Sequence, residues 1–444
     1  MSLLRLPRTP TAPFCPSEVR GDVAVPEKLS WTQKLFRTAG PGLLIAVGYV
    51  DPGNWATDIE AGSRYGYDLL FVVILCGLGA ILLQYLAMRL GLAGGRDLAQ
   101  MARDRYSPFQ CRLLWVLAEL AIIATDVAEV LGTALAFHLL LGIPLWAGVL
   151  LTGLDTLIVL GLRGQGFRQL EAIILGLILT IGICFAAQLA ISPPDPAGLL
   201  HGAMPKIDIL TDHHALYLSI GILGATVMPH NLYLHSSIVQ TRAAGTDEPS
   251  VRQHIRFATI DIVGALLLAT LVNAAILSLS AATFHANGFT EVAEIDDAYR
   301  LIEPITGAAV GAVLFGIALL AAGQSATFTG TIAGQVILEG FLDLHIPCWL
   351  RRVITRGLAL IPALAGLLWL GDHAVGKMLV FTQVVLSLQL PFAIFPLIRF
   401  TSNHEIMGAF ASSMPIRVMA WGLFALIVAA NIWLVIGWLA AGSF

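Results

Sequence analysis

The sequence of 444 residues is poor in charge: Asp, Glu, Lys and Arg make up 12% of it, against roughly a quarter in a soluble globular protein. Hydrophobic residues make up 57%, and the mean hydropathy is +0.81. A chain this apolar has too few polar side chains to cover one soluble core, which excludes the ordinary cytosolic enzymes. The net charge of −4, without any Lys/Arg cluster, gives no indication of nucleic-acid binding. The composition therefore predicts an integral membrane protein.

Motifs for disulfides, hydrolysis and secretion are missing as well. The predicted spans contain neither GxSxG nor HExxH, which argues against an intramembrane hydrolase or zinc protease. Residues 1–38 lack the apolar core of a cleaved signal peptide and are expected to form a cytoplasmic tail. The cysteines are odd in number and include no CxxC pair, so we expect no disulfide, no thiolate metal site and no cofactor. They are Cys15, Cys76, Cys111, Cys184 and Cys348.

Long apolar segments fill the rest of the chain. Because about 20 apolar residues cross a bilayer, hydropathy predicts an all-α polytopic protein with eleven transmembrane helices. Spans 1–5 (39–191) and spans 6–10 (214–398) form two blocks of five, with an extra helix at 416–441. Since five is odd, the second block would be inverted relative to the first. The expected spans are 39–63, 68–90, 113–141, 145–162, 169–191, 214–240, 257–282, 307–337, 354–370, 375–398 and 416–441.

Basic residues are distributed unevenly over the predicted loops. With the N-terminus inside, all 25 Lys and Arg residues of the chain fall on the cytoplasmic side except Arg64, Lys206, Arg300 and Lys377. This asymmetry is the one that the positive-inside rule describes. We expect a multi-pass protein of a bacterial plasma membrane, with the N-terminus in the cytoplasm and the C-terminus outside.

Two spans are interrupted in the same way. Residues 51–54 read DPGN in the middle of span 1, and residues 228–231 read MPHN in the middle of span 6. Each proline removes the N–H that would bond the carbonyl four residues earlier, which frees the carbonyls of Gly48 and Ala225. Ordinary proline kinks are the alternative, because transmembrane helices tolerate them. Breaks at matching places of two halves favour the midplane substrate site of a secondary transporter.

The side chains at the breaks indicate which substrate such a site would hold. The charge of Asp51 is costly inside a membrane unless a cation compensates it. Asn54 and the freed carbonyls offer neutral oxygens, and Met228 offers a thioether, a soft ligand that suits Mn²⁺, Fe²⁺ or Cd²⁺ better than Mg²⁺ or Ca²⁺. A packing role is the alternative for Met228. The set predicts a site for a divalent transition metal.

Span 3 carries three acids inside an apolar run: Glu119, Asp126 and Glu129. At 100° per residue they lie along one stripe of a helix. We interpret the stripe as a path for protons or cations, with structural hydrogen bonding as the alternative. Arg351 and Arg352 at the start of span 9 are expected either to pair with these acids or to anchor the helix at the membrane surface.

Two histidines follow the break in span 6. A histidine near a midplane acid, such as His230, can titrate near physiological pH. For His235, packing and function are equally supported. The two lie five residues apart, about 140° around a helix, so they do not form a zinc motif.

The segments DPGNWATDIEAG (51–62) and MPHNLYLHS (228–236) resemble the two signatures of the Nramp family, the proton-coupled divalent metal transporters. The similarity includes spans 3 and 10 and covers essentially the whole chain after residue 38. It implies a LeuT-like fold with helix 11 outside the repeats, and import of Mn²⁺ or Fe²⁺, also Cd²⁺ and Co²⁺, by alternating access. The substrate, protons and the lipid bilayer would be the only partners, with no obligatory protein partner. The implied metal ligands are Asp51, Asn54, Met228 and the Ala225 carbonyl, with Gly48 and Gln383 joining in particular conformations.

The resemblance also assigns roles in proton transfer. It makes His230 a proton-linked gating residue and places Arg352 in the relay. A proton displaced from Asp51 would leave through Glu129, Asp126 and Glu119. A sodium-coupled amino-acid symporter of the same fold is the alternative function, disfavoured because Asp51 would repel an organic carboxylate. A channel is excluded less firmly, since broken helices also line pores.

Overall fold

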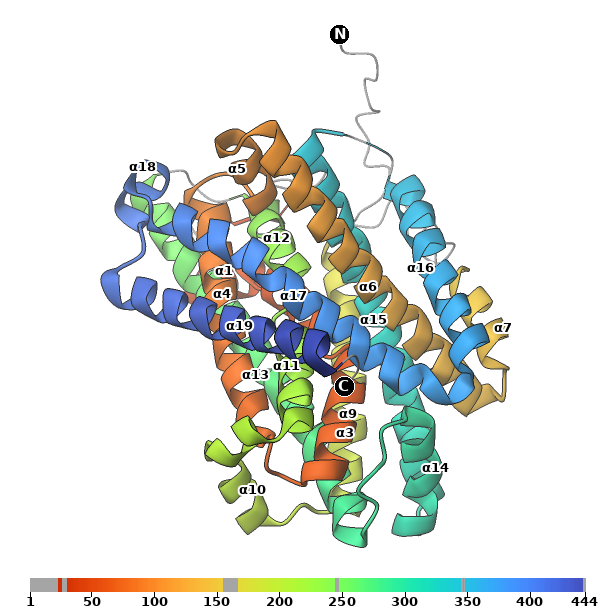
Figure 1. Cartoon of the computed structure of the whole chain (residues 1–444). Helices are drawn as coiled ribbons and strands as arrows, with labels where there is room; N and C mark the ends of the chain where they lie inside the picture. Colours follow the sequence, from red (N-terminus) through yellow and green to blue (C-terminus); the bar gives the residue numbers. More distant parts are fainter. Residues whose placement is uncertain are drawn as a thin grey trace.

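Figure 1 shows the computed structural model of the chain as a bundle of long helices, with α17 and α19 lying side by side and obliquely across the near face. The structure describes residues 23–25, 30–154, 167–243, 247–344, 346 and 348–441. The helices are α1 (Trp31–Thr38), α2 (Pro41–Gly48), α3 (Pro52–Tyr65), α4 (Leu70–Ala93), α5 (Leu98–Arg105), α6 (Pro108–Leu141), α7 (Leu145–Thr152), α9 (Phe167–Ile191), α10 (Pro196–Gly202), α11 (His213–Thr226), α12 (Pro229–Ile238), α13 (Glu248–Thr283), α14 (Ile295–Thr306), α15 (Ala309–Leu342), α16 (Cys348–Leu370), α17 (Val375–Ser402), α18 (His404–Met407) and α19 (Met414–Ala441). Short 3₁₀ turns are η1 (Ile207–Thr211), η2 (Val239–Thr241), η3 (His285–Asn287), η4 (Asp372–Ala374) and η5 (Gly408–Phe410).

Both predicted helix breaks are present. α2 ends at Gly48 and α3 begins at Pro52, while α11 ends at Thr226 and α12 begins at Pro229. In each case the residue before the proline has extended backbone, as expected from the steric demand of the proline ring. Proline is well suited to the first position of the next helix, because its missing N–H would be unpaired there.

Eight helical segments of the described chain are long and apolar enough to cross a membrane, and the interrupted pair α11 and α12 counts as one of them. They are 70–93, 168–191, 213–241, 248–287, 309–342, 353–370, 375–402 and 414–439. The other expected spans are the interrupted pair α2 and α3, the acid-bearing α6, and 145–162, of which 155–166 lie outside the described residues. The all-α class is therefore confirmed, while the count of eleven spans stays a prediction.

Several spans extend beyond the predicted boundaries. α6 begins at Pro108, five residues before the expected start, and α13 begins at Glu248, nine residues before. In both cases the first turn is capped by the residue before it: Ser107 accepts a hydrogen bond from the N–H of Gln110, and Asp247 from that of Ser250. Hydropathy detects only the apolar part of a helix, so polar ends outside the bilayer are missed.

The segment before the first span is attached to the bundle. Trp31 of α1 lies edge-on against Phe257 of α13, with ring centroids 5.6 Å apart. Further towards the N-terminus, β1 (Val23–Ala24) pairs in parallel with β2 (Arg242–Ala243), the strand that follows α12. The segment predicted as a cytoplasmic tail therefore includes a helix and a strand.

The interrupted helices lie in the interior of the bundle. Most residues of α2, α3, α11 and α12 are buried, and the ends of α11 and α12 that meet at the break are buried throughout, whereas the outer helix α19 is mostly exposed. Trp55, fully buried on α3, packs against Phe185 of α9 and Phe315 of α15, with ring centroids 4.8 and 5.1 Å away. Aromatic contacts of this kind fix α3 to its neighbours. The outer apolar surface, including Trp438 and Leu439, is left to face lipid.

Candidate functional site

The two helix breaks meet through a chain of hydrogen bonds. Asp51 caps the start of α3, and its Oδ1 accepts from the backbone N–H of Asn54 at 2.9 Å and from Asn54 Nδ2 at 2.6 Å. The same Nδ2 donates to the carbonyl of Ala225 on α11 at 3.1 Å. The carbonyl that Pro229 frees therefore lies within reach of the acid that Pro52 places at a helix start. Asp51 and Ala225, two of the predicted metal-site residues, lie 174 positions apart in the sequence and come together here.

Close backbone approaches bring further predicted residues to the breaks. A Cβ on Gly53 would collide with the Gln383 amide of α17, so this amide lies against the first turn of α3. A Cβ on Gly48 would likewise collide with Asn231, which places the end of α2 against the first turn of α12. Met228 is fully buried in the second break, directly before α12.

Polar atoms without partners collect around these breaks. Within the described part of the chain, Asp51 Oδ2, Gln383 Oε1, Thr226 Oγ1 and both side-chain polar atoms of Asn231 are buried without a hydrogen bond. Buried polar groups are nearly always paired, because each unpaired one costs about 1 to 3 kcal/mol. A polar ligand bound between the breaks would satisfy them.

The donor set has one charge. Among the described residues no group of three His, Cys, Asp or Glu is arranged to hold a metal. The two breaks instead offer one carboxylate, amide and carbonyl oxygens, and the thioether of Met228. Oxygen ligands with a single soft sulfur suit a borderline dication, and the single carboxylate keeps binding weak enough for release.

A polar network beside the site was not predicted from the sequence. Asn273 of α13 donates through Nδ2 to Asn54 Oδ1 at 3.2 Å and to the Tyr49 carbonyl at 2.8 Å. Gln84 of α4 donates to the Tyr49 hydroxyl at 2.8 Å, and its Oε1 lies 3.0 Å from His235 Nδ1. His235 is thus a hydrogen-bonded residue that joins α12 to the break after α2.

The acids of α6 lie along α15 and α16. A Cβ on Gly330 of α15 would lie 3.0 Å from Glu129 Oε1 and 3.2 Å from Asp126 Oδ1, so both carboxylates face α15 at this glycine. Glu119, further along the same stripe, pairs with Arg351 and accepts from Trp115 Nε1 at 2.9 Å.

The cation beside Glu129 is one that sequence reasoning missed. Arg356 Nη1 lies 4.0 Å from Glu129 Oε2, and Arg356 Nη2 donates to Thr327 at 3.1 Å. Arg356 was counted among the cytoplasmic basic residues, yet its side chain is 5% exposed and lies inside the bundle. Arg352, the arginine that the resemblance favours, belongs to α16, and its side chain falls outside the described part.

His230 connects the break in span 6 with the acid-bearing helix. Its Nδ1 lies 3.3 Å from Thr125 Oγ1 of α6, one residue before Asp126. Because His230 follows Pro229 directly, the ring lies between the break and the stripe of acids. It is 1% exposed, so any proton that it carries must pass to a protein group or an enclosed water.

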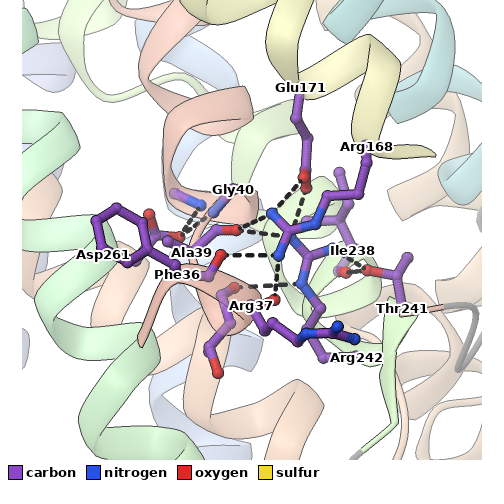
Figure 2. A network of polar contacts seen from close by, with 12 residues as sticks. Phe36, Arg37, Ala39, Gly40, Arg168, Glu171, Ile238, Thr241, Arg242 and Asp261 are labelled. Carbon is purple, nitrogen blue, oxygen red and sulfur yellow. Dashed lines mark hydrogen bonds and ion pairs between the residues drawn. The ribbon is translucent and has the colours of Figure 1, made fainter. Parts of the chain in front are cut away.

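A charged cluster surrounds the segment that leads into α2 (Figure 2). Arg168 of α9 donates to the carbonyls of Phe36, Arg37 and Ala39 at 2.6–2.8 Å. Arg242 of β2 donates to the carbonyls of Thr38 at 3.2 Å and Ala39 at 2.9 Å.

Glu171 of α9 bridges these two arginines, at 2.9 Å from Arg168 and 2.5 Å from Arg242. On the other side of the segment, Asp261 of α13 accepts from the N–H groups of Gly40 and Gly42 at 3.1 and 2.7 Å. Gly40 has φ +135°, and a Cβ there would collide with Glu171 and Arg242, so only glycine fits. The cluster fastens the start of α2 to α9, β2 and α13. Acids within two predicted spans, at 171 and 261, were the signal that could have revealed it.

Comparisons with known proteins agree on one family. Residues 42–437 match the family model described as natural resistance-associated macrophage protein-like (Nramp). The divalent metal cation transporter MntH of Ralstonia nicotianae is 63% identical, covering 97% of each chain. MntH 1 of Pseudomonas aeruginosa is 62% identical, covering 98% of this chain and 99% of the relative. The manganese transporter of Eremococcus coleocola is 38% identical with a TM-score of 0.86, covering 94% of this chain and 89% of that one. A nucleobase–cation-symport-1 transporter, with a TM-score of 0.57 and 14% identity over 91% of this chain and 84% of its own, shares the fold alone.

Proposed function

Because the chain belongs to the Nramp family, we propose that it imports divalent transition metals, Mn²⁺ and Fe²⁺ as well as Cd²⁺ and Co²⁺, into the cytoplasm together with protons. The family is one of transporters with a LeuT-like fold, so the chain is a transporter and not an enzyme, and the metal is its substrate rather than a cofactor. The sequence predicted this family and this fold correctly. The metals, the protons and the residues that carry them are the proposal.

The observation that carries the proposal is the meeting of the two breaks. Asp51, Asn54 and the Ala225 carbonyl are joined by hydrogen bonds of 2.6 and 3.1 Å, and unpaired buried oxygens surround them. We assign the metal to Asp51, Asn54, Met228 and the Ala225 carbonyl. The Gly48 carbonyl and Gln383 would join as the helices move during transport.

Metal binding requires the Asn54 amide to turn. In the structure its Nδ2 occupies both acceptors that the metal would take, Asp51 Oδ1 and the Ala225 carbonyl. A rotation by 180° would present Asn54 Oδ1 to the metal and direct Nδ2 at Asn273. Asn273 Oδ1 has no partner among the described residues and can accept this N–H if Asn273 turns as well.

That second rotation would break the Asn273 bond to the Tyr49 carbonyl. Tyr49 belongs to the break after α2 and is tied through Gln84 to His235 of α12. Binding of the dication would therefore loosen α2 from its neighbours, which gives alternating access a physical trigger.

The proton route that we propose begins at the same acid. A dication on Asp51 displaces its proton or is accompanied by one, and His230, which follows Pro229 in the second break, lies against Thr125 of α6. From there Asp126 and Glu129 carry the proton along α15 towards Glu119, with Arg356 and Arg351 as the facing cations. Arg352 remains a proposed member of the relay on the family resemblance.

We place the charged cluster of Figure 2 at the cytoplasmic face, where nearly all basic residues of the predicted topology lie. The N-terminus is then cytoplasmic, the C-terminus outside, and the membrane a bacterial plasma membrane. The alternative, an amino-acid symporter of the same fold, would set a substrate carboxylate beside Asp51, and the geometry of the site does not favour it.

Radiolabelled Mn²⁺ uptake into proteoliposomes, with and without an inside-alkaline pH step, tests the proposal. Asp51→Asn should abolish uptake. Met228→Ala should retain part of the Mn²⁺ uptake, weaken competition by Cd²⁺ and admit Mg²⁺ or Ca²⁺. Met88→Ala is the matched control, because Met88 is an equally buried methionine of α4. Unchanged metal selectivity in Met228→Ala would remove this thioether from the site, and uptake indifferent to the pH step would refute proton coupling.

A further inference from the structure

An apolar groove lies away from the transport site, between the first turns of α6 and the last turns of α17. It encloses about 370 Å³. Leu113 and Leu114 of α6 form one wall, and Pro391, Phe392 and Phe395 of α17 form the other. Leu113, Phe392 and Phe395 are 40–47% exposed, so the walls are open to the outside of the bundle. In a membrane this groove faces hydrocarbon chains.

One end of the groove is polar. Tyr106, Gln110 and Arg399 line it there: Tyr106 follows the last residue of α5, Gln110 lies in the first turn of α6, and Arg399 lies in the last turn of α17, on the proposed cytoplasmic side. Eight residues separate Pro391 from Arg399, which corresponds to about 12 Å along a helix. The groove therefore runs from the polar surface of the membrane into the depth of one leaflet.

The polar end contains groups that lack partners. The Tyr106 hydroxyl is shielded from solvent and makes no hydrogen bond within the described part of the chain. The Arg399 guanidinium lies over the Phe395 ring, 5.7 Å from its centroid, and forms no ion pair with any described residue. Asp104, the acid in the last turn of α5, pairs with Arg96 at 3.5 Å. An arginine without an ion pair and a shielded tyrosine hydroxyl without a hydrogen bond, both judged among the described residues, thus line the same end of the groove.

The surroundings favour an anion there. Arg105 and Arg112 are exposed on either side of the α6 start, and the N-terminal end of a 34-residue helix adds a partial positive charge. The groove between α11, α17 and α19 offers a contrast. It encloses about 400 Å³ but is lined without any charged side chain, by residues such as Tyr217, Phe381 and Trp438.

We infer that the α6–α17 groove binds one anionic phospholipid of the cytoplasmic leaflet. The lipid phosphate accepts hydrogen bonds from Arg399 and from the Tyr106 hydroxyl, and an acyl chain lies along Leu113 and Phe392. A cation without a counter-ion selects an anionic headgroup over a zwitterionic one. Because the lipid touches both α6 and α17, it holds together the helix that carries the acid stripe and the helix that carries Gln383.

Native mass spectrometry of the purified full-length protein tests this inference. The probes are dioleoylphosphatidylglycerol and dioleoylphosphatidylcholine, added in equal amounts. We expect the wild type to retain one phosphatidylglycerol with at least tenfold preference. Arg399→Gln should reduce the preference to within twofold, and Tyr106→Phe should reduce it at least threefold. Arg256→Gln is the control, because Arg256 is an exposed arginine on the same side and should keep the preference.

Three results would overturn the inference. The first is an unchanged preference in both Arg399→Gln and Tyr106→Phe. The second is an equal loss in Arg256→Gln, which would indicate diffuse attraction by the basic surface. The third is displacement of the lipid by an equal concentration of sn-glycerol 1-phosphate, which has the headgroup without chains and would make the groove a simple anion site. Should Arg399→Gln fail to fold, Tyr106→Phe decides, since it removes a single oxygen that bonds nothing in the described structure.

Discussion

Arg242→Gln should open the transporter on the side that we propose to be cytoplasmic. The Arg242 side chain is fully buried, and Glu171 beside it is 5% exposed, so the substitution removes a buried cation from a buried acid. It also leaves the carbonyls of Thr38 and Ala39 without this donor. Breaking a buried ion pair by removing one partner costs about 3 to 5 kcal/mol. Glu171 keeps Arg168 at 2.9 Å, which argues for the lower end of that range.

The substitution destabilises only the conformation in which the charged cluster is formed. The cluster exists only while the start of α2 lies against α9 and α13, so a state with α2 moved away does not lose it. About 3 kcal/mol corresponds to roughly a hundredfold change in the ratio of closed to open molecules, because 1.4 kcal/mol is tenfold. Such a shift is enough to make an open state dominant where it is normally a minor one.

Thiol labelling measures this ratio. In a background without native cysteines, Ala46→Cys places a small thiol on α2 at a position that is 2% exposed. A membrane-impermeant maleimide on the cytoplasmic side should label it up to a hundredfold faster in Arg242→Gln. Arg252→Gln is the control, because the Arg252–Glu248 pair is exposed and worth less than about 1 kcal/mol. An unchanged labelling rate in a folded Arg242→Gln protein would refute the argument, as would equal acceleration in both variants.

Three further predictions concern other parts of the molecule. Burial raises the pKa of Asp97, the cap of α5, to about 7, against about 3.9 in an unfolded chain. Because the folded state binds this proton more tightly, stability should fall as the pH rises from about 4 to 7. Asp97→Asn should remove that slope from thermal unfolding, whereas Asp247→Asn, at an exposed cap whose pKa is lowered by Ser250, should not. A stability curve of the same slope in Asp97→Asn would exclude this group as the cause. Gly53→Ala would force a Cβ into the Gln383 amide and should weaken Mn²⁺ binding, measured by calorimetry, at least tenfold. Gly176→Ala, in a helix with open space around it, should leave Mn²⁺ binding as it is. Equal affinities of the two variants would show that Gln383 moves away at no cost. Glu129→Gln should keep Mn²⁺ binding but lose the acceleration of uptake by a pH step. Glu60→Gln is the control, because the Glu60 carboxylate lies 2.9 Å from His214, away from the acids of α6. An intact response to pH in Glu129→Gln would take Glu129 out of the proton path.

The parts of the site that the sequence predicted depend on local chemistry. Pro52 and Pro229 interrupt a helix wherever they occur in its interior, so both breaks and the residues beside them were available from the sequence. The stripe of acids on α6 follows from helix periodicity in the same way. Neither inference required knowledge of which helices are neighbours.

The parts that were missed depend on packing between helices. Asn273 and Gln84 are unremarkable polar residues of their spans until α13 and α4 set them against Tyr49. Arg356 lies among basic residues that resemble membrane anchors, and only the packing of α16 on α6 turns it towards Glu129. Hydropathy also missed the first turns of α6 and α13, because capping side chains start those helices outside the apolar segment.

The pairing of β1 with β2 connects the amino-terminal segment to the charged cluster at the start of α2. Val23 and Ala24 lie beside Arg242 and Ala243, and Arg242 is one of the residues that fasten the start of α2. A force on the chain ahead of position 23, for example from a bulky fusion partner or a bound antibody, would therefore act through this pair of strands on the charged cluster at the start of α2. Tags for purification or imaging therefore belong at the opposite terminus, after α19, where no such lever exists among the described residues.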